Sequence, residues 1–362
     1  MIYFIALSLA SVFTFLNIFK YITFRSGCAL FTSFLLSLLI GGKLINYLKF
    51  LQKKGQPIRE LGLESHSGGK RGTPTMGGIL LLGSALISTL LWANLKNPYI
   101  WVVIFTIISF ALIGAVDDYR KLKHNNTKGV SARYKFGLQI FLSLIITIII
   151  SNLSPVEISS SIAFPFFKNL LLDLHLFYFL FSIIVITGSS NAVNLTDGLD
   201  GLAIGPVIIV TVFFTILCYL TGNVIFSDYL KISYIPNSGE LTVFCSALIG
   251  SGLGFLWFNA PPAKVFMGDI GSLALGAVIG VLAIITKHEL ILMITGGLFV
   301  IEAVSVILQV GSFKLRGKRI FKMAPIHHHF EKLGWSEPTI VIRFWIIAII
   351  FALLGLFTLK IR

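Results

Sequence analysis

The chain has 362 residues, of which 56% are hydrophobic and 12% are charged, and its formal net charge is +14. A soluble domain carries about twice that charged fraction, so this composition excludes a water-soluble globule and makes the bilayer the solvent. The basic residues lie between apolar runs, which indicates membrane topology and anionic substrates as the reason for the positive charge, and no nucleic-acid partner is expected.

Apolar runs long enough to cross a bilayer recur along the chain, since a spanning helix needs about 20 mostly apolar residues. They are predicted over 27–48, 74–95, 99–116, 134–151, 171–190, 202–221, 241–258, 270–286, 290–311 and 339–359. An eleventh apolar stretch, 1–19, carries several polar side chains and is a weaker candidate. No basic residue precedes Lys20, so a cleaved signal peptide is not expected.

These runs predict an all-α integral membrane protein with about ten transmembrane helices. No repeat or linker divides the chain, so we expect one polytopic membrane domain over residues 1–362. By count, 19 Lys and Arg residues fall in the loops on one side and 8 in those on the other. The richer side is expected to be cytoplasmic, which places both termini outside. If residues 1–19 also spanned, the N-terminus would lie inside.

Most of the aspartates gather on the predicted cytoplasmic face. They are Asp117, Asp118, Asp197, Asp200 and Asp269, five of the seven in the chain. A single aspartate at a helix end usually meets water and does nothing more. Five on one face, each within a motif rich in Gly or Asn, predict a functional site because acids at a membrane boundary are costly without partners.

Two of the polar motifs on this face combine charge with a helix end. The segment 65–78 contains Lys70, Thr75 and several glycines, which suit phosphate binding but also occur in ordinary topology-setting loops. In Asp117-Asp118-Tyr119-Arg120-Lys121, two adjacent carboxylates repel, which favours a divalent cation or a lysine partner. Oxygen ligands of this kind suit Mg²⁺.

Two further motifs follow apolar runs. The run 191–202, NAVNLTDGLDGL, has amides, carboxylates and glycines at short spacing and no basic residue, which is typical of a ligand cradle. In the segment 259–272, Asp269 stands where the next helix is predicted to begin. It could cap that helix, or it could bind Mg²⁺ beside a helix N-terminus that favours phosphate.

The fifth polar segment, 314–338, carries three consecutive histidines, His327, His328 and His329. Without a cysteine or a second histidine group beside them, structural zinc is not expected. Facing residues on a helix are three or four positions apart, so three adjacent imidazoles cannot all point one way. We expect them to bind a sugar or a diphosphate.

The motifs together resemble those of the polyprenyl-phosphate N-acetylhexosamine-1-phosphate transferase superfamily. The aspartate pair, NAVNLTDGLDGL and FMGDIGS carry the resemblance to the superfamily. GGKRGTPTMGG, GKRIFKM and APIHHHFE are similar to the members that transfer phospho-N-acetylmuramoyl-pentapeptide. The similarity runs along essentially the whole chain, with no departure at the motif acids or histidines.

This resemblance implies a reaction between UDP-N-acetylmuramoyl-pentapeptide and undecaprenyl phosphate that gives lipid I and UMP. It also implies Mg²⁺ as the cofactor, a cytoplasmic active site, a place in the bacterial cytoplasmic (inner) membrane and a homodimer. Direct attack by the lipid phosphate and a covalent aspartyl-phosphate both remain open. Transfer of N-acetylglucosamine phosphate is the rival within the superfamily, and a transporter is the rival from another class.

The resemblance also assigns roles to individual positions. Metal ligands are expected at Asp117, Asp118 and Asp269, and catalytic roles at these three and at His328. Substrate contacts are expected at Lys70, Thr75, Lys121, Lys135, Asn191, Asn194, Asp197, Gly198, Leu199, Asp200, Asn259, Phe266, Gln309, His327, His328 and His329.

Overall fold

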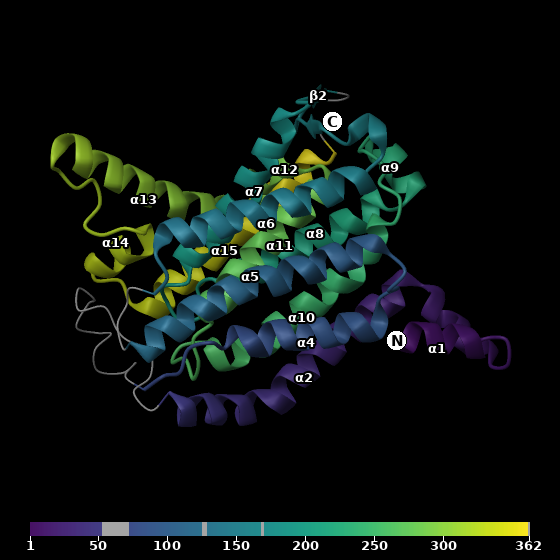
Figure 1. The fold of residues 1–362 in the computed structure, drawn as a ribbon, viewed down its shortest axis with the longest axis horizontal. Helices are drawn as coiled ribbons and strands as arrows, with labels where there is room; N and C mark the ends of the chain where they lie inside the picture. The colour runs from purple at the N-terminus through teal and green to yellow at the C-terminus, as the bar shows by residue number, and fades with distance from the viewer. Residues whose placement is uncertain (53–71, 125–128, 168–169, 361–362) are drawn as a thin grey trace.

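A computed structural model describes residues 1–52, 72–124, 129–167 and 170–360. In this part of the chain, nine helices are long and apolar enough to cross a membrane. They are α2 (Ile22–Leu51), α5 (Pro98–Lys123), α6 (Ala132–Leu153), α7 (Phe177–Thr196), α8 (Ile204–Thr221), α10 (Leu241–Asn259), α11 (Gly268–Thr286), α13 (Gly297–Arg316) and α15 (Glu337–Thr358). A shorter apolar helix, α4 (Gly78–Trp92), packs among α2, α10 and α11. The predicted all-α integral membrane fold is confirmed (Figure 1).

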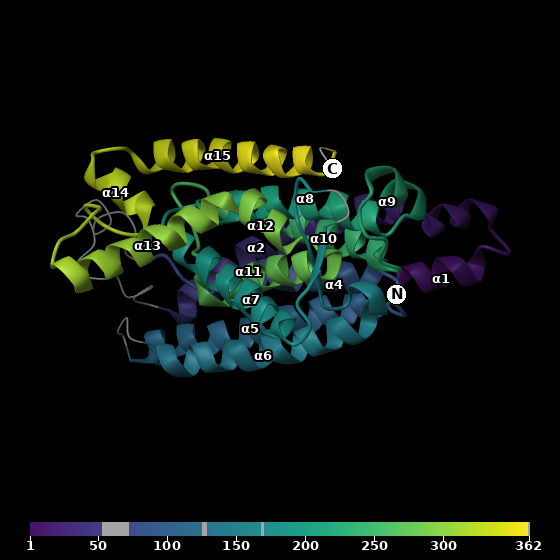
Figure 2. The ribbon, with the colours of Figure 1, turned by 90° about the horizontal axis from the view of Figure 1, so that it is seen from above.

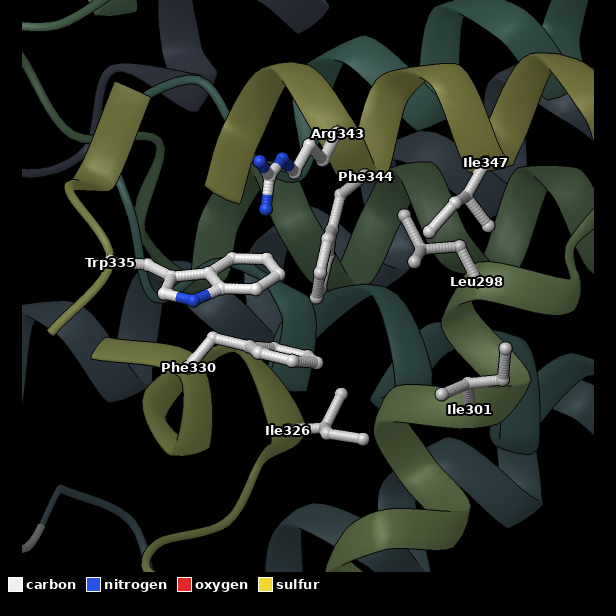
Figure 3. Close-up of a pocket in the computed structure, with 8 residues that line it drawn as sticks. All are labelled: Leu298, Ile301, Ile326, Phe330, Trp335, Arg343, Phe344 and Ile347. Atoms are coloured by element: carbon white, nitrogen blue, oxygen red, sulfur yellow. The ribbon is translucent and has the colours of Figure 1, made fainter. Parts of the chain in front are cut away.

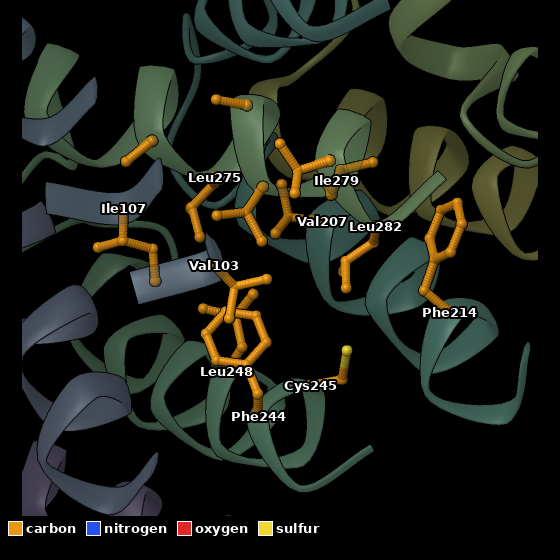
Figure 4. Close-up of a cluster of buried hydrophobic side chains, with 14 of the residues drawn as sticks. Val103, Ile107, Val207, Phe214, Phe244, Cys245, Leu248, Leu275, Ile279 and Leu282 are labelled. Atoms are coloured by element: carbon orange, nitrogen blue, oxygen red, sulfur yellow. The ribbon is translucent and has the colours of Figure 1, made fainter. Parts of the chain in front are cut away.

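Helix α11 forms the centre of the bundle, and almost its whole length is buried. It packs mainly against α5 and α7, with α8, α4 and α6 also in contact. Apolar side chains of α5, α8, α10 and α11 meet in the core, as Figure 4 shows. Gly276 and Gly280 let α11 approach α7 closely, because a Cβ at Gly280 would lie 2.5 Å from Ser189 Oγ. The middle of α11 therefore fixes the spacing of the helices that reach the polar motifs.

The predicted span 290–311 is not one helix. Instead, α12 (Glu289–Thr295) ends at Gly296 and α13 begins at Gly297. Two adjacent glycines are a common cause of a helix break, since they carry no side chain to hold the turn. Helix α13 then leaves the bundle, as Figures 1 and 2 show, and most of its surface is exposed.

Several short elements complete the fold. They are α1 (Ile2–Leu9), the 3-10 helices η1 (Thr14–Lys20), η2 (Val156–Ile158) and η3 (Ser238–Glu240), the hairpin β1 (Ser161–Ala163) with β2 (Leu171–Asp173), α9 (Val224–Leu230) and α14 (Ile326–Lys332). The stretch 1–19 thus forms two short helices, each below the length of a span. The span predicted from residue 171 begins only at Phe177, because 171–173 pair antiparallel with β1.

Candidate active site

The acid pair lies on the last turns of α5, which continues to Lys123, beyond the predicted end at residue 116. Both carboxylates are buried, with Asp117 at 3% and Asp118 at 2% exposure. Gly114, one turn earlier, lets the start of α11 lie against α5, because any Cβ at Gly114 would collide with the main chain of Asp269. This close approach brings Asp269 beside the acid pair.

The three aspartates form one cluster. One oxygen from each of Asp117, Asp118 and Asp269 lies within 4.8 Å of the others. Asp118 Oδ2 also accepts from the Ile270 main-chain N–H, which fixes it against the start of α11. Carboxylate oxygens at this spacing fit a hard divalent cation, which binds through a few carboxylates and completes its shell with phosphate and water. The donor set therefore agrees with the predicted magnesium ligands.

Two lysines share the charge of this cluster. Lys121 Nζ lies 2.6 Å from Asp117 Oδ2 and 3.1 Å from Asp269 Oδ2. Lys135, in the first turn of α6, places its Nζ 2.5 Å from Asp269 Oδ2 and 3.7 Å from Asp117 Oδ2. Lys135 falls inside the predicted span 134–151, and α6 begins slightly earlier, at Ala132. Both ammonium groups are thus held where they could turn to a phosphate.

The polar run 191–196 continues helix α7 and is not a loop between helices. Asn194 Nδ2 donates to Asp269 Oδ1 at 3.0 Å and to Ser272 Oγ at 2.7 Å. Asn191, one turn earlier, donates to Gln139 Oε1 at 2.8 Å and so ties α7 to α6. Ser272 was not among the predicted site residues, although it lies one turn after Asp269 on the same helical face.

The loop after α7 presents the acids and glycines of the cradle. Gly198 is exposed, whereas Leu199 is buried in an apolar cluster with α15. Burial, followed by the negative charge of Asp269 and two further acids, raises the pKa of the Asp197 carboxyl to about 8. Asp200 Oδ2 accepts from Ala263 N at 3.0 Å, which ties the loop to the segment before α11.

The segment before α11 is joined to both neighbouring motifs. Asn259 Oδ1 accepts from Gly201 N at 3.1 Å, so the buried Asn259 braces the cradle. Phe266 is partly exposed, and its N–H donates to Pro74 O at 2.9 Å. Thr75, which follows Pro74, is buried: its N–H donates to Gln52 Oε1 at 2.9 Å, and its main-chain oxygen accepts from Gln52 Nε2 at 3.1 Å. Lys70 lies outside the described residues.

The three histidines fall on the short helix α14 and do point to different partners. His327 is fully buried, with Nδ1 3.0 Å from Glu302 Oε2. His328 Nδ1 lies 2.6 Å from Glu331 Oε2, and the side chain of His328 is 21% exposed. His329 Nδ1 accepts from the Lys322 N–H at 3.1 Å. Glu331 stands one turn after His328 on α14, whereas Glu302 comes from α13, so its pairing with His327 is a tertiary contact that spacing does not predict.

Gln309 of α13 holds the segment that leads to the histidines. Its Oε1 accepts from Ile320 N at 3.0 Å and from Phe321 N at 2.9 Å, and its Nε2 donates to Phe321 O at 3.0 Å. In the structure, this predicted substrate contact therefore satisfies main-chain groups of the loop between α13 and α14.

An apolar cavity of about 240 Å³ lies among α13, α14 and α15 (Figure 3). Its lining comprises Leu298, Ile301, Ile326, Phe330, Trp335, Arg343, Phe344 and Ile347. The Arg343 guanidinium lies 4.2 Å from the centre of the Trp335 ring, and that ring stacks on Phe330. The helix that carries the histidines is thus held to α15 by aromatic contacts.

Comparison with known proteins identifies the family of the chain. The glycosyl transferase family 4 matches residues 100–287, and a phospho-N-acetylmuramoyl-pentapeptide-transferase signature matches residues 70–82. The protein of that name from Rickettsia prowazekii (strain Madrid E) is 58% identical over 347 residues, 96% of each chain. The one from Pelagibacter ubique (strain HTCC1062) is 55% identical over 362 residues, the full length of both. The chain therefore belongs to glycosyl transferase family 4, and within it to the phospho-N-acetylmuramoyl-pentapeptide-transferases.

Proposed function

We propose that the chain transfers phospho-N-acetylmuramoyl-pentapeptide from UDP-N-acetylmuramoyl-pentapeptide to undecaprenyl phosphate, forming lipid I and UMP. The observation that carries this proposal is the meeting of three carboxylates with two lysines at the end of a transmembrane bundle. Such a cluster suits phosphoryl transfer between two anions, which depends on positioning and charge neutralisation. The transferred group follows from the names of the full-length relatives.

The reaction proceeds by direct attack of the lipid phosphate. A phosphate monoester loses its second proton near a pKa of about 6, so at neutral pH the attacking oxygen is already an anion and gains little from a base. It forms a bond to the sugar-bearing phosphorus, and the bond from that phosphorus to the oxygen of UMP breaks. Lys121 and Lys135 turn from their carboxylates to the phosphate oxygens and hold the two anions together.

Asp117, Asp118 and Asp269 would hold Mg²⁺, which supplies neutralisation of the diphosphate charge when bound. Asn194 fixes the orientation of Asp269 through its hydrogen bond to Oδ1. Asp117 and Asp118 are buried and Asp269 is 14% exposed, and the helices that carry them touch at Gly114, so the bundle presents the ligand oxygens in a fixed arrangement.

The nucleotide lies on the cradle beside this cluster. Phe266 is partly exposed and stacks on the uracil, while Gly198 gives the main chain room to approach the ligand. Hydrogen bonds to the nucleotide come from Asp197, Asp200 and Asn259 or from the loops that these side chains hold in place. His328 and His329, with Lys70 and Gln309, contact the sugar or diphosphate. The histidine helix therefore selects the substrate and does not bind the metal.

The site faces the cytoplasm of the bacterial inner membrane, and two copies of the chain form a homodimer. The orientation is supported by the excess of Lys and Arg in the loops at the end that carries the site. Ser336→Cys, at an exposed position, should react with a membrane-impermeant thiol reagent only after the cytoplasmic side is opened. Labelling from outside in intact cells would reverse this orientation.

The decisive experiment uses the purified chain with undecaprenyl phosphate, Mg²⁺ and either UDP-N-acetylmuramoyl-pentapeptide or UDP-N-acetylglucosamine. UMP release and a lipid-linked sugar are expected with the first nucleotide sugar only. UMP release with UDP-N-acetylglucosamine alone would indicate the rival specificity, transfer of N-acetylglucosamine phosphate. Release with neither would reject the transferase, and uptake of substrate by proteoliposomes without UMP release would indicate a transporter.

A further inference from the structure

Glu302 is a carboxylic acid buried deep in an apolar helix, and the reaction described above does not use it. It lies in α13, is 0% exposed, and its Oε1 and Oε2 lie 3.1 and 3.0 Å from His327 Nδ1. A charged group inside a transmembrane segment is costly and usually functional, and it requires a partner. His327, also 0% exposed, is that partner.

The second nitrogen of His327, unlike Nδ1, lacks a hydrogen-bond partner among the described residues. This nitrogen, Nε2, is buried. It points at Gly198, where a Cβ would collide with Nε2 and would lie 2.9 Å from Cε1 of the same ring. A buried polar atom without a partner destabilises the state that contains it, so this nitrogen is expected to gain a partner in another state of the protein.

The pairing with Glu302 determines what Nε2 can do. Both carboxylate oxygens lie at accepting distance from Nδ1, so that nitrogen carries the hydrogen. In a neutral imidazole the other nitrogen is then an acceptor. Glu302 thus fixes both the plane of the ring and its tautomer, and it turns the acceptor toward the exposed Gly198 in the loop after α7.

We propose that Glu302 is a positioning residue for the nucleotide sugar. It acts through His327, whose Nε2 accepts a hydrogen bond from an O–H or N–H of the nucleotide when the ligand settles on the loop at Gly198. The inference rests on the proposed function only for the identity of that ligand. The absence of a side chain at Gly198 is part of the device, because a methyl group there would occupy the place of the ring.

The test measures UMP and UDP binding by calorimetry, and the KM and kcat for UDP-N-acetylmuramoyl-pentapeptide, with the full chain in detergent. Glu302→Leu should weaken nucleotide binding and raise KM about tenfold, which corresponds to about 1.4 kcal/mol, with a smaller change in kcat. Glu302→Gln keeps an oxygen that accepts from Nδ1 and should stay within about threefold of the unmodified chain. Ile307→Leu, at an exposed position of α13, is the control.

Variants of His327 distinguish the roles of its two ring nitrogens. His327→Asn keeps a donor near Nδ1 for Glu302 but lacks Nε2, so it should weaken binding as much as Glu302→Leu. Because both act on one contact, the double variant should be no weaker than either single one. Gly198→Ala should weaken binding less in His327→Ala than in the unmodified chain, since the ring that its methyl group would strike is gone.

Unchanged nucleotide binding in Glu302→Leu and His327→Asn, or fully additive losses in the double variant, would overturn the inference. If Glu302→Leu does not fold, His327→Asn and the Gly198 pair decide the matter. Calorimetry with UMP and UDP keeps this test separate from the transferase assay. A chain that binds nucleotide through His327 but releases no UMP would refute the proposed function and leave the positioning role intact.

Discussion

Helix α11 carries a charged cluster at each end, and the two clusters differ in kind. At its N-terminal end, Asp269 meets two further carboxylates and two lysines. Just after its C-terminal end, Lys287 Nζ donates to Tyr178 Oη at 2.7 Å, and that hydroxyl donates to Glu289 Oε1 at 2.8 Å. Each cluster joins α11 to its neighbours.

The clusters at the two ends of α11 differ in charge balance and in exposure to solvent. Lys287 and Glu289 carry one charge of each sign, and both are 1% exposed. At the other end, three acids outnumber two bases, and the side chains of Asp269, Lys121 and Lys135 are 14%, 22% and 16% exposed. A closed, balanced cluster neutralises its own charge and holds helices together, whereas an open cluster with excess charge leaves its groups available to a ligand. We therefore interpret the closed cluster after α11 as structural and the open cluster at the start of α11 as the candidate site.

The largest effect is expected from Asp269→Asn. An amide keeps the size of the side chain and its place at the start of α11 but loses the charge that binds Mg²⁺, so UMP release should fall by at least about 10³-fold. The protein should still insert and purify. Glu289→Gln is the matched change at the other end of α11 and should retain turnover. Near-normal turnover of Asp269→Asn at saturating Mg²⁺ would contradict the role of Asp269 as a metal ligand and the functional difference between the two ends of α11.

The second prediction tests whether helix α14 belongs to the same site as the open cluster. His328→Ala should lower UMP release by about tenfold or more, because a partly exposed imidazole contributes hydrogen bonds to the nucleotide sugar. The Mg²⁺ concentration dependence should stay unchanged, since Mg²⁺ prefers oxygen to imidazole. Rescue of the variant by raised Mg²⁺, or histidine-dependent zinc in the purified protein, would instead make α14 part of a metal site.

The third prediction concerns pH. Below pH 8, Asp197 is mostly the neutral acid, because its raised pKa of about 8 favours the protonated form. Above that pH it adds a negative charge beside the proposed diphosphate site, so KM for the nucleotide sugar should rise by roughly three- to tenfold. Asp197→Asn, which cannot ionise, should show a flat KM across pH 7–9. An identical rise in that variant would assign the effect to another group.

The smallest effect on turnover is expected at the closed end. Lys287→Met leaves Glu289 buried without its cation, which should cost about 3–5 kcal/mol of stability and lower the melting temperature. Turnover of the folded protein should change by less than about twofold, since no contact reaches the site. Replacing Glu289 by Leu in the same chain should restore part of the lost stability. A large loss of turnover at unchanged stability would show that the two ends are coupled.

The same contrast explains what the sequence could reveal. Hydropathy predicts the spans because apolar runs are stable in the bilayer. The distribution of Lys and Arg among the loops then assigns Asp117, Asp118 and Asp269 to one face. Neither reveals that Arg25 and Lys287, two of the eight basic residues counted on the outer side, are buried, Arg25 in an ion pair with Glu240. Those partners are distant in sequence, and only packing brings them together.

Local patterns also failed where tertiary contacts decide the structure. The polar run after residue 190 stays helical because α6 and α11 supply partners for Asn191 and Asn194. The break at Gly296 lies inside a continuous apolar run, where hydropathy gives no signal. The pairing of Glu302 with His327 spans 25 positions, and no spacing rule predicts it.

The departure of α13 from the bundle has a consequence for the kinetics of the reaction. Its outer surface stays apolar, with Ile307 67% and Leu308 48% exposed. A carrier lipid can therefore reach the polar end of the bundle by lateral diffusion, with its chain still in hydrocarbon and only its phosphate at the boundary. The encounter takes place in two dimensions. Turnover should follow the mole fraction of carrier in the membrane, so diluting it with inert phospholipid at constant bulk concentration should slow the enzyme.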